Sequence, residues 1–305
     1  MLSNKRFQGL IILVFSVFAL LMTGCSKLIV LNSKGPIGQE ETTLIYMSIG
    51  AMLIVIVPVF VMTYLFVKRY RASKNNPDYQ PNWVHSTKIE LVIWLVPLMI
   101  VVFLSYLVWV KTYELDPYKP IASDNKPLNI EVISLDWNWL FIYPDYDIAM
   151  VNELVIPEKV PLSFRLTSST VMTSFFIPQL GSQMYAMAGM QTRLHLMADE
   201  TGTYEGHNIE FSGEGYDTMY FKVVAKTMQD FDDWVNQDKG DNNQLDLAAY
   251  SKLSQPSIDY PVTIFSPVEP GLFNHVMQSF MGWMGDHQNM KNMGMDEMNT
   301  MKKGN

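Results

Sequence analysis

The chain has 305 residues, of which 49% are hydrophobic, and a formal net charge of −8 at pH 7. This negative charge, without a stripe of interleaved basic and aromatic residues, excludes nucleic-acid binding. The single cysteine, Cys25, excludes an internal disulfide, a cysteine-based zinc site and an iron–sulfur cluster within the chain. Hydrophobic residues concentrate in 7–23, 44–67 and 89–110, whereas 111–270 has mixed polarity, which predicts a membrane protein with one large aqueous domain.

The N-terminus has the layout of a bacterial signal peptide. Lys5 and Arg6 precede an apolar run that ends in "LMTGCS". The Thr-Gly-Cys ending resembles a lipoprotein cleavage box. We therefore expect 1–24 to be removed and Cys25 to become the lipid-carrying start of an extracytoplasmic segment, 25–42. The alternative is an incidental thiol in an uncleaved first membrane helix.

Two apolar stretches are each long enough to cross a bilayer of about 30 Å at about 1.5 Å per residue. They predict transmembrane helices at 43–67 and 89–110. The loop 68–88 begins with the basic run "KRYRASK", so the positive-inside rule places it in the cytoplasm. The second helix returns the chain to the outer side, where 111–128 is expected to be a linker.

Glu90 lies at the cytoplasmic edge of the second predicted span, in "HSTKIELVIW". A carboxyl group at this depth costs little free energy if it reaches the headgroups. Position alone therefore leaves two interpretations of Glu90, a snorkelling side chain or a proton-collecting acid that faces a partner subunit.

From Leu128 onward, short runs with period two are rich in β-branched and aromatic residues and are separated by Pro, Gly, Asp and Asn. They predict an antiparallel sandwich or barrel of about 100 residues. After Ala225, "TMQDFDDWVNQ" and "LDLAAYSKLS" favour helices, and "GLFNHVMQSFMGWM" has the pattern of an amphipathic segment with aromatic and Met anchors. The tail, 286–305, has Met at short intervals. Thioethers with His275 and His287 could bind Cu(I), but such tails are more often disordered or adaptable packing surface.

The strings "SLDWNWLFIYPD", "VMTSFFIPQLGSQMYAMAGMQTRLHLMADETGTYEG" and "FSGEGY" resemble subunit II of the quinol-oxidising haem–copper terminal oxidases, the cytochrome bo-type and aa-type enzymes. The similarity extends from about Cys25 to about Met281. It implies membrane α plus all-β architecture: a two-helix transmembrane hairpin and an extracytoplasmic cupredoxin-like β-sandwich, 129–225, that lacks the dinuclear copper site. A short helical aromatic-rich segment, 226–285, and the flexible tail, 286–305, follow.

The resemblance also assigns the copper positions of the cytochrome c-oxidising branch, in which two thiolates, two imidazoles and a thioether hold the metals. In this sequence the first His position is Thr173, the Cys positions are Asn208 and Ser212, and the second His position is Tyr216. Glu210 and Met219 are retained from the copper loop. Because the only cysteine is Cys25, no register supplies thiolates, and we expect no metal site in this chain. His207 is the one imidazole in the loop and is interpreted as a structural or surface residue.

By the resemblance, this chain supports subunit I in a complex that oxidises membrane quinol, reduces oxygen to water and pumps protons. The haems and one copper are expected in subunit I, with subunits III and IV as further partners. Glu90 is then expected at the mouth of a proton-uptake channel. Trp137 and Trp139 match the aromatic stretch under the copper and are expected to pack between the sandwich and subunit I.

Two other functions are weighed against this one. An exported membrane lipoprotein could bind or deliver copper through its Met/His-rich tail, but it would need neither the two spans nor Glu90. A cytochrome c oxidase subunit is opposed by the missing thiolates. The quinone type, ubiquinol or menaquinol, and the haem types depend on contacts made by another chain.

Overall fold

The computed structural model describes residues 28–71, 84–238 and 243–280. The expected signal peptide, Cys25, His287 and the tail lie outside these residues. The chain divides into two compact units, a helical unit of Glu40–Asp116 and a sandwich unit that contains Pro117 onward together with the residues up to Gln39. Each unit is described by itself.

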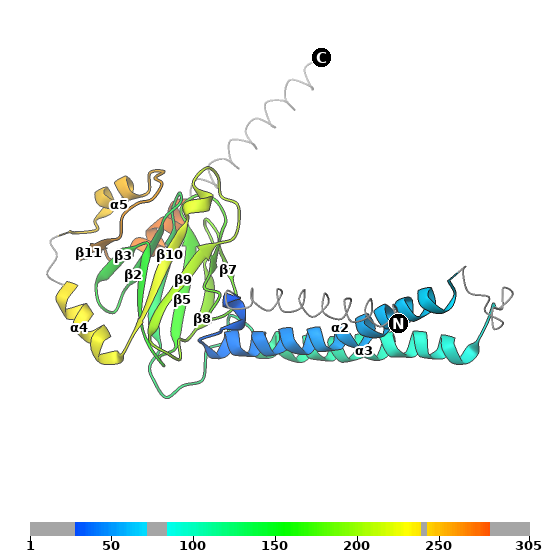
Figure 1. Ribbon diagram of the computed structural model, residues 1–305. Coiled ribbons are helices and arrows are strands. Elements are labelled where there is room, and N and C mark those ends of the chain that lie inside the picture. Colours follow the sequence, from blue (N-terminus) through cyan, green and yellow to red (C-terminus); the bar gives the residue numbers. More distant parts are fainter. Residues whose placement is uncertain (1–27, 72–83, 239–242, 281–305) are drawn as a thin grey trace, which may run out of the picture. The chain divides into compact units, whose positions relative to one another are not determined.

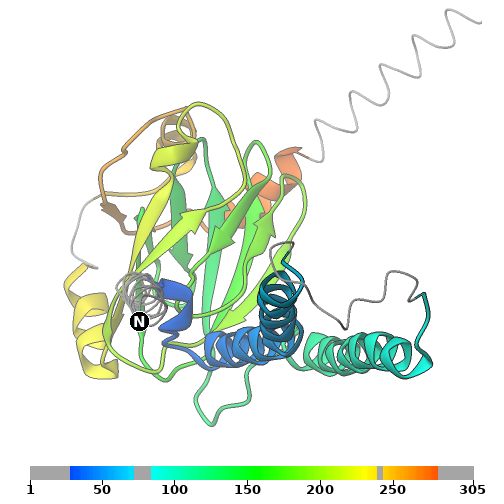
Figure 2. The same cartoon turned by 45° about the vertical axis from the view of Figure 1, so that its right-hand side comes forward.

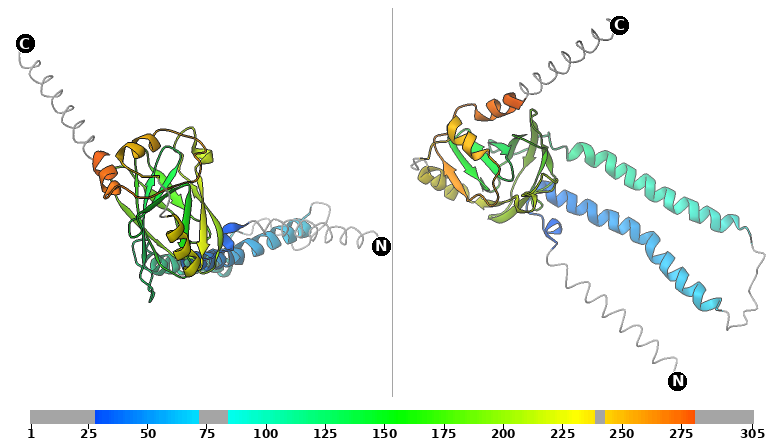
Figure 3. Two further views of the ribbon diagram at one scale, coloured as in Figure 1. Left: turned by 90° about the vertical axis from the view of Figure 1, so that its left-hand side faces the viewer. Right: turned by 90° about the horizontal axis from the view of Figure 1, so that it is seen from above.

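The helical unit contains two long helices, α2 (Pro36–Arg69) and α3 (Thr87–Glu114), shown in Figure 3. Both are long and apolar enough to cross a membrane, which confirms the two expected apolar helices. Each tolerates an internal proline, Pro58 in α2 and Pro97 in α3. Lys111 of α3 lies 3.0 Å from the Glu40 carboxylate of α2 and therefore joins the two helices at one end.

The sandwich unit contains two sheets that face each other (Figure 1). Among the described residues, the first sheet contains, in spatial order, β11 (Thr263–Phe265), β3 (Ile148–Val151), β2 (Trp139–Tyr143), β1 (Leu128–Ser134), β5 (Leu162–Ser168) and β8 (Thr192–Leu196). The second sheet contains β4 (Glu153–Pro157), β10 (Tyr220–Lys226), β9 (Gly202–Asn208), β6 (Thr173–Phe176) and β7 (Met184–Ala186). The expected β-sandwich is thus present.

The expectation of a purely antiparallel arrangement is wrong. β1 pairs with β5 in parallel, and β10 pairs with β4 in parallel. The run "MVNELVIP" has a strand pattern throughout, but it contains parts of two strands, β3 and β4, which lie in different sheets. Asn152 separates them, with a positive φ of 58° that few residues other than Gly, Asn and Asp adopt readily. A change of backbone direction at Asn152 therefore moves the chain from one sheet to the other.

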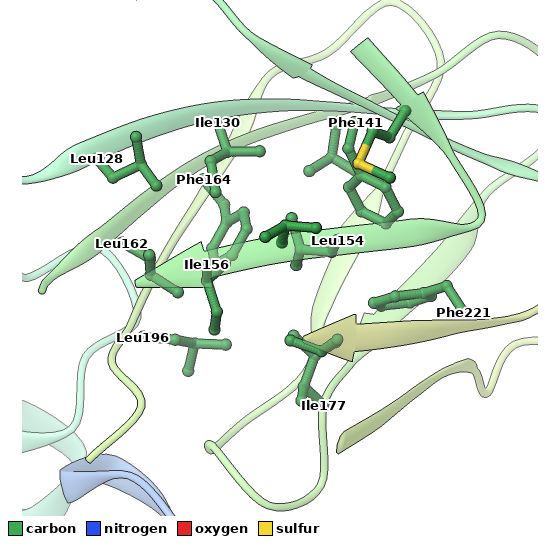
Figure 4. Packing of buried hydrophobic residues seen from close by; sticks show 14 of the residues in the cluster. Leu128, Ile130, Phe141, Leu154, Ile156, Leu162, Phe164, Ile177, Leu196 and Phe221 are labelled. Atoms are coloured by element: carbon green, nitrogen blue, oxygen red, sulfur yellow. The ribbon is translucent and has the colours of Figure 1, made fainter. Parts of the chain in front are cut away.

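The space between the sheets is filled by apolar side chains that point toward one another from both layers (Figure 4). Phe175 of β6 and Phe221 of β10 stack with ring centroids 5.2 Å apart. Gly206 is needed beneath the second ring, because a Cβ atom there would lie 2.0 Å from the ring of Phe221. Close packing between the sheets thus explains one glycine of "GTYEG".

The C-terminal segment adds helices to the outside of the sandwich and supplies β11, the edge strand of the first sheet. It contains α4 (Met228–Asp238), α5 (Leu247–Leu253), β11 and a helix from 272 to the end of the described residues at 280. Figure 2 shows α4 and the 272–280 helix on opposite sides of the sandwich. Leu245, Leu253, Phe265, Phe273 and their neighbours pack on the outer side chains of β1, β2 and β3 as a second apolar cluster. The strands β2 and β3 and the end of β1 are therefore buried on both faces.

The segment 28–39, which includes the first turn of α2, also contacts the sandwich. Lys34 donates its backbone N–H to the Gln179 carbonyl at 2.6 Å, and its side chain pairs with Glu200 at 2.7 Å. A Cβ atom at Gly35 would lie 2.2 Å from the Met197 carbonyl oxygen, so this close approach requires glycine. The segment 28–39 is thus held against the loop between β6 and β7 and the loop after β8.

We expect Phe273→Ala to lower the free energy of unfolding by about 3–5 kcal/mol, because a buried phenylalanine leaves a cavity when it is truncated. Phe273 is 0% exposed, and the Arg165 guanidinium lies 4.8 Å from its ring centroid. Thermal unfolding of the purified full-length protein measures the effect. The matched control is Phe211→Ala, at a side chain that is 77% exposed, and we expect almost no change for it. Equal effects would show that the C-terminal helix does not stabilise the sandwich.

Candidate functional site

The loop between β9 and β10 is organised by the side chain of Asn208. Its Oδ1 atom accepts hydrogen bonds from two backbone N–H groups, those of Ser174 at 2.9 Å and Glu210 at 3.0 Å. Because a backbone N–H can only donate, these two bonds determine which amide atom is the oxygen. The Asn208 side chain is 5% exposed, and its Nδ2 group must therefore point the other way, into the loop.

That Nδ2 group lies 3.3 Å from the sulfur of Met219 and 3.1 Å from the hydroxyl of Ser212. The Asn208 backbone N–H also donates to the Met219 carbonyl oxygen at 3.0 Å. Asn208, Ser212 and Met219 are thus brought together, as the resemblance implies for three positions of a copper loop. In this chain the thioether sulfur accepts a hydrogen bond from an amide.

The other two ligand positions make different contacts. Thr173 is buried on β6, and its hydroxyl donates to the Ser134 hydroxyl of β1 at 2.7 Å, which links the two sheets. Tyr216 begins the short helix η3 (Tyr216–Thr218), and its ring lies 5.7 Å from that of Phe211. Each position therefore has a partner of its own outside the Asn208 group.

The indole of Trp137 packs against both glycines of "FSGEGY", Gly213 and Gly215. Its indole N–H donates to the Ser212 carbonyl oxygen at 3.0 Å. A Cβ atom at Gly215 would lie 2.6 Å from the indole ring, and one at Gly213 would lie 3.2 Å from it. Gly213 also has a φ of 112°, which side chains disfavour. The glycine spacing thus allows the loop to lie flat on Trp137.

Trp139 lies elsewhere, although only one residue separates it from Trp137. It is 0% exposed inside the sandwich, with its ring centroid 5.4 Å from Phe175 and 5.6 Å from Phe221. The expectation that Trp139 packs between the sandwich and another subunit is therefore wrong. The positive φ of 72° at Trp137 breaks the strand pattern between β1 and β2 and separates the two rings.

His207 faces away from the Asn208 group. Side chains alternate along β9, so His207 and the buried Asn208 point to opposite faces of the second sheet. Tyr220 and Phe176 are the neighbours of His207 in the register, and its Nε2 atom lies 3.9 Å from the Glu205 carboxylate. His207 therefore cannot join a ligand set built on Asn208.

The residues at the copper positions do not fit a dinuclear copper centre. They offer two hydroxyls, a phenol and an amide where the chemistry needs thiolates and imidazoles. The amide presents its N–H group, not a lone pair, to Met219, the one soft donor. Within the described ranges, no three His, Cys, Asp or Glu side chains are grouped as they are in a metal site.

Glu90 lies in the first turn of α3, where a negative charge is favourable at the helix N-terminus. Its carboxylate is 2.6 Å from Nδ1 of His85, and the two side chains are 48% and 67% exposed respectively. His85 also lies 3.3 Å from the Thr87 hydroxyl. Glu90 and His85 thus form an accessible pair of titratable groups at one end of the helix.

Several residues of the site are not identifiable from ligand spacing alone. Ser134 accepts the hydroxyl of Thr173, and the backbone N–H of Ser174 donates to Asn208. Asn138 follows Trp137 and accepts a hydrogen bond from the side chain of Asn152. A usable signal exists for the two asparagines, because each interrupts an otherwise apolar or aromatic run. No comparable signal marks the two serines, whose partners are distant in sequence.

Two family models match the chain. One, described as "Cytochrome C oxidase subunit II, periplasmic domain", covers residues 108–227. The other, "COX Aromatic Rich Motif", covers residues 239–284. Together with the two apolar helices, they confirm the expected order of a helical hairpin, a cupredoxin-like sandwich and an aromatic-rich segment.

Curated relatives match over most of their length. "Cytochrome bo(3) ubiquinol oxidase subunit 2" of Pseudomonas putida is 42% identical over 99% of this chain and 96% of the relative. "Ubiquinol oxidase subunit 2" of Acetobacter aceti is 48% identical over 87% of this chain and 87% of the relative. "Quinol oxidase subunit 2" of Bacillus subtilis (strain 168) is 38% identical over 83% of this chain and 79% of the relative.

Among solved structures, the periplasmic domain of subunit II of cytochrome oxidase (CoxB) of Bradyrhizobium japonicum is also similar. It is 22% identical, with a TM-score of 0.36, and the match covers 38% of this chain and 94% of that domain.

We expect Asn208→Ala to lower the free energy of unfolding by roughly 2–4 kcal/mol, because two buried backbone N–H groups lose their acceptor. The control is Asn129→Ala, since Asn129 is exposed and makes only a 3.5 Å contact with Asp145. Thermal unfolding of both variants checks the difference. Similar small losses in the two variants would contradict the organising role of Asn208.

Gly215→Ala is expected to destabilise the loop, because the added methyl group collides with the Trp137 indole. The methyl group would lie 2.6 Å from Cγ and Cδ2 of the indole. Trp137→Ala removes both atoms, so the double variant should lose less stability than the two single losses added together. Unfolding free energies from a double-mutant cycle measure this coupling. If the two losses of unfolding free energy were strictly additive, contact with the Trp137 side chain would not be the reason for glycine at position 215.

Proposed function

This chain belongs to the quinol oxidase subunit II family of the haem–copper oxidases, and on that premise we propose that its complex oxidises membrane quinol, reduces oxygen to water and pumps protons. The chain is a two-pass membrane protein that associates with subunit I. It supports that subunit and contributes no redox metal of its own. The haems and one copper belong to subunit I, and subunits III and IV complete the complex.

The observation that carries this proposal is the Asn208 group. In the copper-containing branch, the metal in this loop would accept electrons from cytochrome c. Here Asn208 and Ser212, which occupy the two Cys positions, hydrogen-bond to each other, and the amide N–H is also directed at the Met219 sulfur. Electrons must then enter the complex elsewhere, and a lipid-soluble quinol can reach subunit I through the membrane.

The test is purification of the complex through a tag on this chain. The haem spectrum is recorded, and oxygen consumption is measured with a quinol and, separately, with reduced cytochrome c. We expect haem and oxygen consumption with quinol alone. Equal activity with cytochrome c, or recovery of this chain by itself with stoichiometric copper, would contradict the proposal. The second outcome would instead support a copper-delivering lipoprotein, which the relatives do not favour.

We also propose that the mature chain begins at Cys25 and carries a lipid there, after removal of residues 1–24. The "LMTGCS" ending supports this assignment. The lipid would add a second membrane attachment to the two helices. Mass spectrometry of the intact purified chain distinguishes the acylated mature form from the full-length chain.

Glu90 is proposed to collect protons for subunit I, with His85 beside it. The 2.6 Å contact and the exposure of both side chains support a path on which a proton can pass from water to either group.

Glu90→Gln is expected to slow turnover several-fold while the haem content of the complex stays unchanged. The glutamine keeps the size of the side chain but cannot release a proton. Oxygen consumption per haem is the measurement, and Glu205→Gln, at an exposed carboxyl of β9, is the matched control. Unchanged turnover in Glu90→Gln would return Glu90 to the role of a snorkelling side chain.

A further inference from the structure

The aromatic-rich C-terminal segment contacts the turn that carries Trp137. Asn138 follows Trp137 and is 1% exposed. Its Nδ2 group donates to the carbonyl oxygen of Ser257 at 3.0 Å and to the Ser257 hydroxyl at 2.8 Å. The Ser257 backbone N–H donates in return to the Asp136 carbonyl at 3.3 Å. The residues on both sides of Trp137 are thus bonded to one residue of the segment.

A second asparagine extends this contact. The Oδ1 atom of Asn152 accepts the backbone N–H of Trp139 at 2.9 Å, so its Nδ2 group must donate. Nδ2 donates to Oδ1 of Asn138 at 2.9 Å and to the carbonyl oxygen of Tyr260 at 2.8 Å. The direction of every bond from Trp139 to Ser257 is therefore determined by one backbone N–H, and no amide in the series can be reversed without the loss of several bonds.

The same segment reaches the loop that precedes β6. Tyr250 of α5 makes a side-chain hydrogen bond with Ser169, and Ser169 donates its hydroxyl to the Ser134 carbonyl at 3.1 Å. In the same loop, the Thr170 hydroxyl donates to the Asp136 carboxylate at 2.6 Å. The segment therefore contacts the turn 136–138 and the loop 169–172, and Trp137 of that turn contacts the loop 208–219.

We propose that the aromatic-rich segment is an intramolecular brace that positions Trp137 and, through it, the loop 208–219. Ser257 and Tyr260 hold the turn 136–138 in the conformation in which the indole lies against Gly213 and Gly215 and donates to Ser212. In the copper-containing branch a metal would order this loop. The brace provides that order in its absence, and this part of the inference rests on the metal-free function proposed above.

The test uses hydrogen exchange of backbone amides in the purified complex. Asn138→Asp has the same shape but directs an oxygen at the Ser257 carbonyl, so that bond is replaced by a repulsive contact, and the Ser257 hydroxyl can keep its bond only as the donor. We expect about tenfold faster exchange in 255–262 and also in 208–219, with β5 unchanged. The control is Asn125→Asp, because the exposed amide of Asn125 donates to a single carbonyl, that of Lys159.

A second variant tests whether Trp137 transmits the effect. The Trp137→Phe variant lacks the indole N–H. In this background, Asn138→Asp should still accelerate hydrogen exchange in 255–262 but should accelerate it much less in 208–219. Opening of 255–262 without any change in 208–219 would overturn the proposal. An equal effect on 208–219 with and without the indole would overturn it as well.

Ser257→Ala provides a milder change if Asn138→Asp prevents assembly. It removes only the hydroxyl that accepts from Asn138, and we expect a smaller increase of exchange in the same two regions. No increase in 208–219 would count against the brace. Oxygen consumption with quinol is measured on the same preparation of unmodified complex that serves as the reference for hydrogen exchange. Absence of this activity would contradict the proposed function, whereas the exchange rates alone test the brace.

Discussion

Two backbone N–H groups, one from β6 and one from the loop after β9, converge on a single oxygen atom of the Asn208 side chain. A buried N–H without a partner costs more free energy than a typical hydrogen bond contributes, so this convergence leaves little freedom for the asparagine. The position of its amide nitrogen follows, and with it the contacts to Met219 and Ser212. The Trp137 packing and the glycines beneath it complete the same end of the sandwich.

The two faces of the first sheet serve different purposes. Alternate side chains of β1 and β2 enter the core between the sheets, as do Ile130 and Phe141, or the outer cluster under the C-terminal segment, as do Ile133 and Leu140. Burial on both faces explains why β2, "WLFIY", is a continuous apolar run. It also means that the C-terminal segment cannot leave without exposing a large apolar surface to water.

The helices and most strands could be predicted from the sequence because their signals are local. Apolar length predicts α2 and α3, and period two predicts β5, β8, β9 and β10. The opposite orientation of His207 and Asn208 also follows from alternation along β9. The parallel pairs could not be predicted in this way, since they join residues that no local pattern connects. The contact of Asn208 with Ser174 escaped prediction for the same reason, because Ser174 lies in β6, 34 positions before Asn208.

The anchoring of residues 28–39 has a consequence for the order of assembly during synthesis. Lys34 and Glu200 are 166 positions apart, and Gln39 and Asp199 are 160 apart. The segment therefore emerges long before its partners have been translated, and it must wait until both membrane helices and most of the sandwich have followed. Contacts of such large sequence separation form late because closing the intervening loop costs entropy. Docking of this segment would then mark the completion of the exported domain, not its beginning.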